Sequence, residues 1–264
     1  MQNINIFLIF FHIYKSGGTT FNWLLQENFP DKVIYAEPPL ENIVPLDKNK
    51  LLKYLKKLNT KNKKLISLSS HNFEYSCYQL AKIPFTILRN PHERNWSAYN
   101  FQNDHFLENN SFENYLIDNE NSQTKSLSLG MLNLDEKIIT DILNTFYIGI
   151  LERFDESMIY LESISKKFGI HLDLSYPEPL NKQNKKAKIL NSNKFNSLEK
   201  KYYSLDFMIY EKANHKLDQE LNKISGLEKK IFNFKARCNK LREIKYKGKR
   251  ENYGQGPEYF NIIK

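Results

Sequence analysis

A lysine followed by glycines and threonines comes directly after an apolar stretch near the start of the chain. Phe10–Phe21 reads Phe-Phe-His-Ile-Tyr-Lys-Ser-Gly-Gly-Thr-Thr-Phe, so an expected strand runs into Lys15, Gly17 and Gly18. Glycines accept backbone angles that other residues avoid, and the N–H groups at the start of a following helix can then converge on an anion. The segment predicts a phosphate-binding loop. Without a ligand, the same residues would form a buried strand, a glycine turn and a threonine-capped helix.

The order of these residues restricts the phosphate ligand. The common nucleotide-binding loop reads G-x-x-x-x-G-K-[ST], with its lysine after the glycines. Here Lys15 precedes Gly17 and Gly18. An ordinary ATP or GTP site is therefore disfavoured.

A second group of phosphate-binding residues follows another short apolar stretch that begins at Phe85. The stretch ends at Arg89, and Pro91 suits the first turn of a helix. Arg89 is therefore expected at the end of a strand, where open α/β sheets bind their ligands. Ser97 lies inside the expected helix, under two turns from its start. A guanidinium and a hydroxyl together suit a phosphate monoester.

The two segments resemble the nucleotide-binding motifs of sulfotransferases, which transfer sulfate from 3′-phosphoadenosine 5′-phosphosulfate (PAPS). The His-x-x-Lys-Ser-Gly-Gly-Thr order is similar to their 5′-phosphosulfate loop, and Arg-Asn-Pro followed by Arg-x-x-Ser-x-Tyr to their 3′-phosphate motif. Asn90 stands where the family usually has Asp, and Tyr14 where it commonly has Pro. The resemblance assigns the phosphosulfate to Lys15, Ser16, Gly17, Gly18, Thr19 and Thr20, and the 3′-phosphate to Arg89 and Ser97.

Three further segments extend the resemblance over most of residues 4–222. Asn121–Lys125 looks like the family's Asn-x-Gln-Thr-[Arg/Lys] segment, and Tyr147–Ser157 contains its Glu-Arg-Phe-Asp-Glu-Ser. Asp206, Tyr210 and Ala213 are similar to its closing helix. The His-x-x-Lys loop and the Gln-Thr segment point to the carbohydrate branch that holds heparan and dermatan uronyl 2-O-sulfotransferases and their bacterial relatives.

A sulfotransferase needs a base for the acceptor hydroxyl, and His71 is the candidate that we favour. It follows the apolar run Leu65–Ser70, so it emerges from the end of an expected strand, and histidine titrates near neutral pH. In the uronyl 2-O-sulfotransferases a Gly-His segment at this place supplies the base. Glu74 is the alternative base, and a strand-end histidine that only bonds backbone is the alternative role for His71. His12 is expected to orient the loop, and His92 to be solvated.

The expected chemistry is an in-line displacement at sulfur. Lys15 would stabilise the oxygen that leaves, while backbone N–H groups of the loop and the hydroxyls of Thr19 and Thr20 hold the other oxygens. No metal is required. Cys77 and Cys238 lack C-x-x-C partners, and the histidines show no metal-binding spacing.

Length and composition fit one enzyme domain. The chain has 264 residues, of which 41% are hydrophobic, enough to build one large core. We expect a sulfotransferase domain over 1–225 and a basic, helical or irregular extension over 226–264. The first apolar stretch, Ile4–Ile13, has no basic leader or cleavage site, no membrane span is expected, and the cytoplasm is the expected location.

The elements expected to position these residues form an α/β fold with a central parallel sheet flanked by helices. Strands are expected over 4–13, 32–36, 65–68, 85–88 and 146–151, and helices over 49–58, 155–168 and twice within 194–221. Right-handed crossovers gather the strand ends at one edge, which places Lys15, His71 and Arg89 on one side. By resemblance, this is the sulfotransferase fold with a P-loop-like phosphosulfate-binding loop, and the basic segment Leu180–Lys188 either closes over the nucleotide or is a solvated charge run.

The net charge of +9 favours anionic partners without naming one. PAPS, an acidic polysaccharide and nucleic acid all fit this charge, and the resemblance favours an acidic glycan as the acceptor over nucleic acid. Two alternatives stay open beside the sulfotransferase reading. One is another P-loop phosphotransferase, and the other is a non-catalytic polyanion-binding protein on the same fold. The acceptor and the oligomeric state cannot be read from the sequence.

Overall fold

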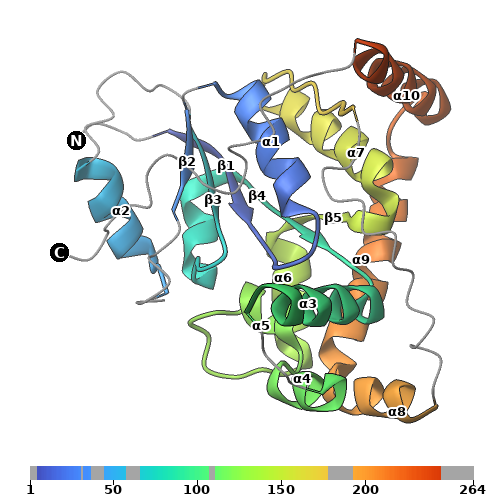
Figure 1. Ribbon diagram of the computed structural model, residues 1–264. Helices are drawn as coiled ribbons and strands as arrows, with labels where there is room; N and C mark the ends of the chain where they lie inside the picture. The colour runs from blue at the N-terminus through green and yellow to red at the C-terminus, as the bar shows by residue number, and fades with distance from the viewer. Residues whose placement is uncertain are drawn as a thin grey trace.

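A computed structural model describes residues 5–30, 32–36, 45–57, 66–106, 111–177 and 193–244. Within them lies a parallel sheet of five strands in the order β2-β3-β1-β4-β5, with helices packed around it (Figure 1). The expected α/β fold with a central parallel sheet is therefore confirmed. The segment Leu180–Lys188 and residues 245–264 of the basic C-terminal extension lie outside the described residues.

The described elements follow the sequence expectations closely. The strands are β1 (Ile6–Phe11), β2 (Val33–Tyr35), β3 (Ile66–Ser70), β4 (Ala81–Leu88) and β5 (Tyr147–Ile150). The α-helices are α1 (Gly18–Asn28), α2 (Lys48–Lys57), α3 (Pro91–Phe106), α4 (Phe112–Asp118), α5 (Ser122–Leu127), α6 (Glu136–Thr145), α7 (Phe154–Lys167), α8 (Asn193–Tyr202), α9 (Ser204–Asn222) and α10 (Leu227–Glu243). Two 3₁₀ turns, η1 (Tyr75–Leu80) and η2 (Leu151–Arg153), complete the set.

The central strand β1 is buried along its whole length. It pairs in parallel with β3 on one side and β4 on the other, and every one of its residues is buried. Successive side chains of a strand point to opposite faces of the sheet, so both faces are covered here. This burial explains why the sequence of β1 is a continuous apolar run.

Strand β4 is longer than expected because it runs through a proline. The apolar pattern after Pro84 predicts a strand from Phe85, since proline is unusual in a central strand. The strand begins at Ala81 instead, and Pro84 pairs with Ile9 of β1. On the other side, β5 pairs only with Phe85–Leu88. Pro84 therefore has a strand neighbour on one side alone, and its missing N–H disrupts no ladder with β5.

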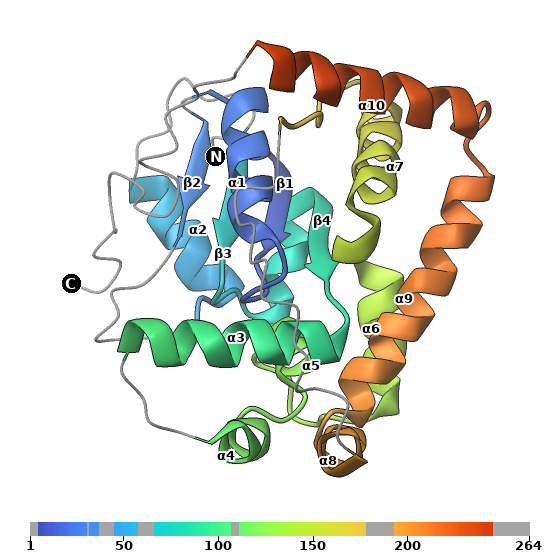
Figure 2. The same cartoon turned by 45° about the vertical axis from the view of Figure 1, so that its right-hand side comes forward.

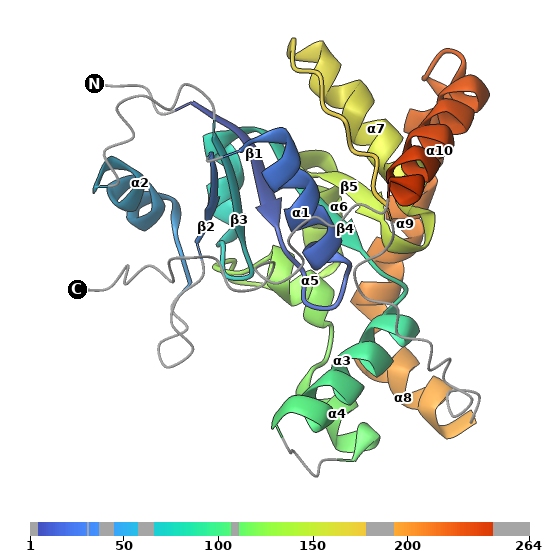
Figure 3. The same cartoon turned by 45° about the horizontal axis from the view of Figure 1, so that its top comes forward.

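The sheet has different helices at its two sides. In Figures 1 and 3, α2 lies beside β2, whereas α7 and α10 lie on the opposite side of the molecule. Figure 2 shows α10 running across one end of α7. Helix α10 packs on α7 through buried Phe234 and an ion pair of Arg237 with Glu162. Helix α10 therefore packs on α7, and α7 in turn packs against β5.

Candidate active site

The loop after β1 has an unusual backbone at two residues. Lys15 has φ 64° and Gly17 has φ 83°, both in the left-handed region, and α1 begins directly afterwards at Gly18. A lysine in this region is strained, and such strain is concentrated at functional sites. The Oγ atom of Ser16 is buried and, within the described residues, has no hydrogen-bond partner. The loop thus places a strained lysine and an unsatisfied hydroxyl at a helix N-terminus, where anions bind.

Gly18 is required by its neighbour His12. A Cβ atom at Gly18 would lie 1.7 Å from Nε2 of His12, far inside van der Waals contact. The imidazole of His12 therefore packs against the first backbone turn of α1. This position agrees with the expected loop-orienting role of His12.

His71 directly follows β3, as expected. It contacts His12 in two ways. Its Nδ1 lies 2.5 Å from the backbone oxygen of His12, and the two rings stack with centroids 3.7 Å apart. A carbonyl oxygen can only accept, so Nδ1 carries the proton, and Nε2 carries the lone pair of the neutral ring. The pKa of His12 lies well below its ordinary value because of burial and the nearby charge of His71.

Lys15 and Arg89 come together at the ends of adjacent strands. Nη1 of Arg89 donates to the backbone oxygen of Lys15 at 3.2 Å. Burial lowers the pKa of both groups, and the charge of Arg89 lowers that of Lys15 further. The Lys15 ammonium also lies 4.2 Å from the ring centroid of Phe101 on α3. Two partly buried cations at neighbouring strand ends favour the binding of an anion beside them.

The backbone of Arg89 is held by one side chain, Gln123. The Arg89 N–H donates to Oε1 of Gln123 at 3.0 Å, and Nε2 of Gln123 donates to the Arg89 oxygen at 2.9 Å. The backbone N–H groups of Gln123 and Thr124 in turn donate to the buried carboxylate of Asp206 on α9. The Gln-Thr segment, for which sequence patterns predicted no role, therefore holds the backbone of Arg89 in place.

A second arginine, Arg94 of α3, forms hydrogen bonds with both the phosphate-binding loop and helix α4. It is buried on α3, and it donates to the backbone oxygen of Tyr14 at 3.2 Å and to the hydroxyl of Tyr115 at 3.2 Å. Arg94 thus fixes the residue that precedes Lys15. Ser97 is also buried on α3, one turn further along the helix.

The alternative base, Glu74, lies in different surroundings from His71. A Cβ atom on Gly130, in the loop between α5 and α6, would be 2.9 Å from the Glu74 carboxyl carbon, so the carboxylate packs against that loop. His71 instead packs against the residue that begins the phosphate-binding loop. Of the two candidates, His71 contacts His12, the residue that follows β1 and precedes the loop of Lys15.

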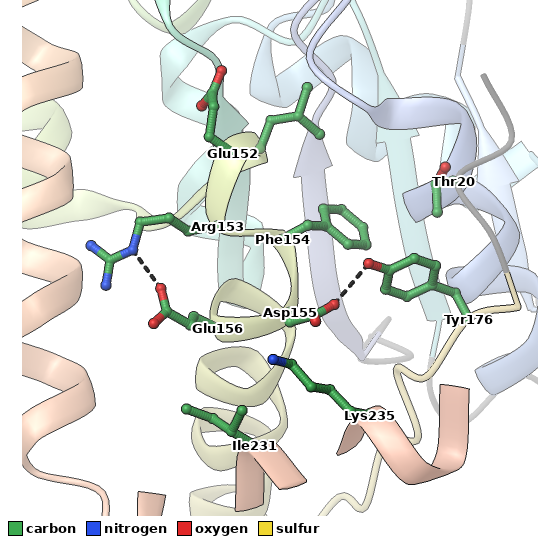
Figure 4. A pocket seen from close by; sticks show the side chains of 10 residues that line it. Thr20, Glu152, Arg153, Phe154, Asp155, Glu156, Tyr176, Ile231 and Lys235 are labelled. Atoms are coloured by element: carbon green, nitrogen blue, oxygen red, sulfur yellow. Dashed lines mark hydrogen bonds and ion pairs between the residues drawn. The ribbon is translucent and has the colours of Figure 1, made fainter. Parts of the chain in front are cut away.

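A pocket of about 540 Å³ opens between α1, the residues that directly follow β5, and α10. Thr20 of α1 lines it together with the start of α7, Tyr176 and α10. Figure 4 shows the hydroxyl of Tyr176 bonded to the carboxylate of Asp155, at 2.7 Å, with Lys235 reaching in from α10. The remaining lining residues are Leu151, Glu152, Arg153, Phe154, Glu156 and Ile231. Sequence patterns gave no sign of this pocket, because its walls come from four separate segments.

His92 was expected to be solvated, but its side chain is only partly exposed and has a buried partner. Its ring pairs with Glu199 of α8, whose side chain is only 1% exposed. Burial of a carboxylate requires a partner, and the histidine supplies one between α3 and α8. The polar sequence around His92 gave no sign of this partner, which lies about a hundred residues later in the chain.

The described residues hold neither a candidate metal cluster nor a candidate membrane span. No group of three or more histidine, cysteine or acidic side chains there could hold a metal ion. No helix within the described ranges has the length and apolar character of a membrane span.

Comparison with known proteins gives similarity to solved structures alone. No family model and no curated protein matches the chain. Among solved structures, a sulfotransferase from Alicyclobacillus acidocaldarius is similar, with 14% sequence identity, a TM-score of 0.46, and an alignment that covers 80% of this chain and 96% of that one.

Proposed function

We propose that this protein is a PAPS-dependent sulfotransferase that transfers sulfate to a hydroxyl group of an acceptor glycan. The observation that carries the proposal is the contact between Arg89 and the backbone of Lys15. It joins the two segments that resemble the 5′-phosphosulfate and 3′-phosphate motifs, and it brings two cations to one edge of the sheet. A ligand with phosphate groups at both its 3′ and 5′ positions suits such a pair.

Local features of the loop fit the donor nucleotide. The buried Ser16 hydroxyl lacks a partner within the described residues, and a phosphate or sulfate oxygen would supply one. The N–H groups that begin α1 and the hydroxyls of Thr19 and Thr20 would hold the phosphosulfate. Arg89 and Ser97 would hold the 3′-phosphate.

The pocket between α1, the start of α7 and α10 would hold the nucleoside of the donor. Thr20 both lines that pocket and belongs to the phosphosulfate loop. Its volume of about 540 Å³ lies in the range of small-molecule sites. The donor would therefore extend along the sheet edge from β1 to β5.

His71 would act as the general base. In its neutral form, the hydrogen bond from Nδ1 to the His12 carbonyl leaves the lone pair on Nε2. Nε2 would accept the proton of the acceptor hydroxyl as that oxygen bonds to sulfur. The bond from sulfur to the bridging oxygen breaks at the same time, which gives a sulfate ester and 3′-phosphoadenosine 5′-phosphate. Lys15 would stabilise the charge on the leaving oxygen.

The proposed binding of the donor nucleotide is tested by calorimetry with three nucleotides. We expect 3′-phosphoadenosine 5′-phosphate to bind far more tightly than 5′-AMP or ATP, because only it engages Arg89 and Ser97 at a 3′-phosphate. Equal affinities would contradict the sulfotransferase function. Preference for ATP would favour a P-loop phosphotransferase.

The transfer step is tested with radiolabelled sulfate. The labelled donor is offered to uronic and neutral polysaccharides and to lipid and small-molecule acceptors. Tight nucleotide binding without transfer to any acceptor would favour the non-catalytic polyanion-binding protein. Transfer to a polysaccharide would establish the reaction and its acceptor together.

A further inference from the structure

A second pocket lies at the N-terminus of α2, away from the residues proposed to bind the donor. Its volume is about 440 Å³. Three lysines contribute to its wall, together with a serine of η1. The lining residues are Asp47, Lys48, Asn49, Lys50, Lys53 and Ser76.

Backbone bonds fix this pocket close to the proposed base. The segment before α2 pairs with the residues that follow His71: the N–H of Leu46 donates to Asn72, and the N–H of Glu74 donates to Leu46. Ser76, which lines the pocket, is five residues beyond His71. Even a fully extended chain would therefore place their Cα atoms at most about 18 Å apart. A ligand that reaches His71 can also reach the pocket if it is a few sugar units long.

The charge of the pocket is positive, and it comes from side chains. Asp47 caps α2 by accepting from the N–H groups of Asn49 and Lys50, so the end of the helix is already satisfied. Lys48 donates to Gln79, and Lys50 pairs with Asp47 at 3.4 Å. The pocket lining thus carries three ammonium groups and one carboxylate.

Lys53 is the most available of the three ammonium groups. Its side chain is exposed, and within the described part of the chain it has no hydrogen-bond or ion-pair partner. An exposed, unpaired ammonium costs little desolvation when an anion binds beside it. Lys53 is therefore the group with which a ligand of the pocket would interact most strongly.

The order of sites along the sheet edge indicates what that ligand is. In the order β2-β3-β1-β4-β5, the lysine-lined pocket is at the β2–β3 side, His71 follows β3, Lys15 follows β1 and Arg89 follows β4. The larger pocket is lined by the residues that follow β5. The donor nucleotide would use β1, β4 and β5. The β3–β2 side is left for the acceptor, with the base between the two.

We propose that the pocket formed by Lys48, Lys50 and Lys53 binds a carboxylate of an acidic glycan, so that the sugar hydroxyl to be sulfated lies at His71. This inference rests on the proposed function. An acceptor need not carry sulfate before transfer, so uronic acid carboxylates are the anions that such a glycan can offer. The pocket then selects acidic over neutral chains and fixes their position.

The test compares two lysines of the same helix. Lys53 and Lys56 are both exposed on α2, but only Lys53 lines the pocket. Lys53→Glu and Lys56→Glu therefore change the net charge equally. The probe is a hexasaccharide of alternating glucuronic acid and N-acetylglucosamine, titrated by calorimetry at low salt with 3′-phosphoadenosine 5′-phosphate present. The same hexasaccharide with its carboxyl groups reduced to alcohols is the neutral probe.

We expect Lys53→Glu to weaken binding of the acidic hexasaccharide at least about 10-fold and Lys56→Glu to weaken it less than about 2-fold. The reduced hexasaccharide should bind wild type weakly and show no difference between the variants. The milder Lys53→Gln, with its melting temperature, checks that the fold is kept. Equal effects of the two glutamates, or equal binding of both probes by wild type, would overturn the proposal.

The nucleotide titration separates this inference from the function on which it rests. Tight binding of 3′-phosphoadenosine 5′-phosphate together with no preference for the acidic probe would overturn the lysine pocket and leave the sulfotransferase standing. Loss of nucleotide selectivity together with a Lys53-dependent preference for the acidic probe would support the anion pocket and contradict the sulfotransferase.

Discussion

The ring of His71 stacks on the ring of His12, and its Nδ1 donates to the backbone oxygen of the same residue. One histidine thereby fixes both the plane and the tautomer of the other. Because the acceptor in this bond is a backbone atom, it persists when the side chain of His12 is changed. The orientation of the proposed base is built into the strand end itself.

Replacement of His71 by Ala should lower the rate of sulfate transfer by about 10²- to 10⁴-fold, the range that a general base contributes. Affinity for 3′-phosphoadenosine 5′-phosphate should change less than about 2-fold, since the donor is proposed to lie on the other side of Lys15. Initial rates and calorimetry measure the two effects. His215→Ala, at an exposed histidine of α9, is the control. A His71 variant that no longer binds nucleotide would have a structural role instead.

The depressed pKa of His12 should make the fold sensitive to mild acid. The cause is burial, followed by the charge of His71. Below about pH 6.5, His12 binds a proton in the unfolded chain but not in the folded chain, so the free energy of unfolding falls as pH falls. Between about pH 7.5 and about pH 5.5 this loss is on the order of 1 kcal/mol.

Urea denaturation of wild type and His12→Gln at both pH values measures this loss. The variant should lose less stability than wild type on acidification, whatever its stability at the higher pH. Equal losses in the two proteins would mean that His12 takes up its proton normally in the folded state.

The positions of Lys15, His71 and Arg89 follow from the sequence because each comes directly after a short apolar run. Such runs predict buried parallel strands, and the carboxyl ends of parallel strands meet at one edge. The glycines after Lys15 and the proline after Arg89 further mark where each strand gives way to a helix. Local patterns were therefore enough to place the three residues at the same edge of the sheet.

Contacts between segments that are distant in the sequence could not be predicted from the same local patterns. Gln123 bonds the backbone of Arg89, and Glu199 pairs with His92, in each case between residues that share no local periodicity. The available signal was a polar residue inside an otherwise buried helix face, as with Asp206 of α9. Such a residue indicates a buried partner, although its identity depends on the packing of the whole chain.

Gly18→Ala should destabilise the protein through a clash with His12. The added methyl group would lie 1.7 Å from Nε2 of the imidazole, and overpacking of this kind costs about 1–3 kcal/mol. In a His12→Ala background the space is free, and Ala is a better helix former than Gly by about 1 kcal/mol. The same substitution should then be neutral or stabilising. Urea denaturation of the four proteins of this cycle checks it, and equal destabilisation in both backgrounds would exclude the clash.

Arg89→Gln should reduce the preference for a 3′-phosphate. Loss of a charged hydrogen-bonding group is expected to weaken binding of 3′-phosphoadenosine 5′-phosphate by about 10- to 100-fold and to leave 5′-AMP nearly unchanged. Gln123→Ala removes only the amide that holds the Arg89 backbone, so its effect should have the same pattern and be smaller. Calorimetry with both nucleotides measures the ratio. A parallel loss for both nucleotides would place Arg89 elsewhere on the ligand.

Lys15 combines backbone strain with the proposed catalytic charge, and two substitutions separate them. Lys15→Gly relieves the positive φ of 64°, so the free energy of unfolding should rise by about 1 kcal/mol. Lys15→Met keeps the strain and the apolar stem but removes the ammonium, so stability should stay closer to that of wild type. Both variants should transfer sulfate about 10²- to 10³-fold more slowly, because both lack the charge at the leaving oxygen. Urea denaturation and initial rates test the pair: a methionine variant that keeps full activity would show that the charge is not used, and a glycine variant without added stability would show that the strain is not stored at this residue.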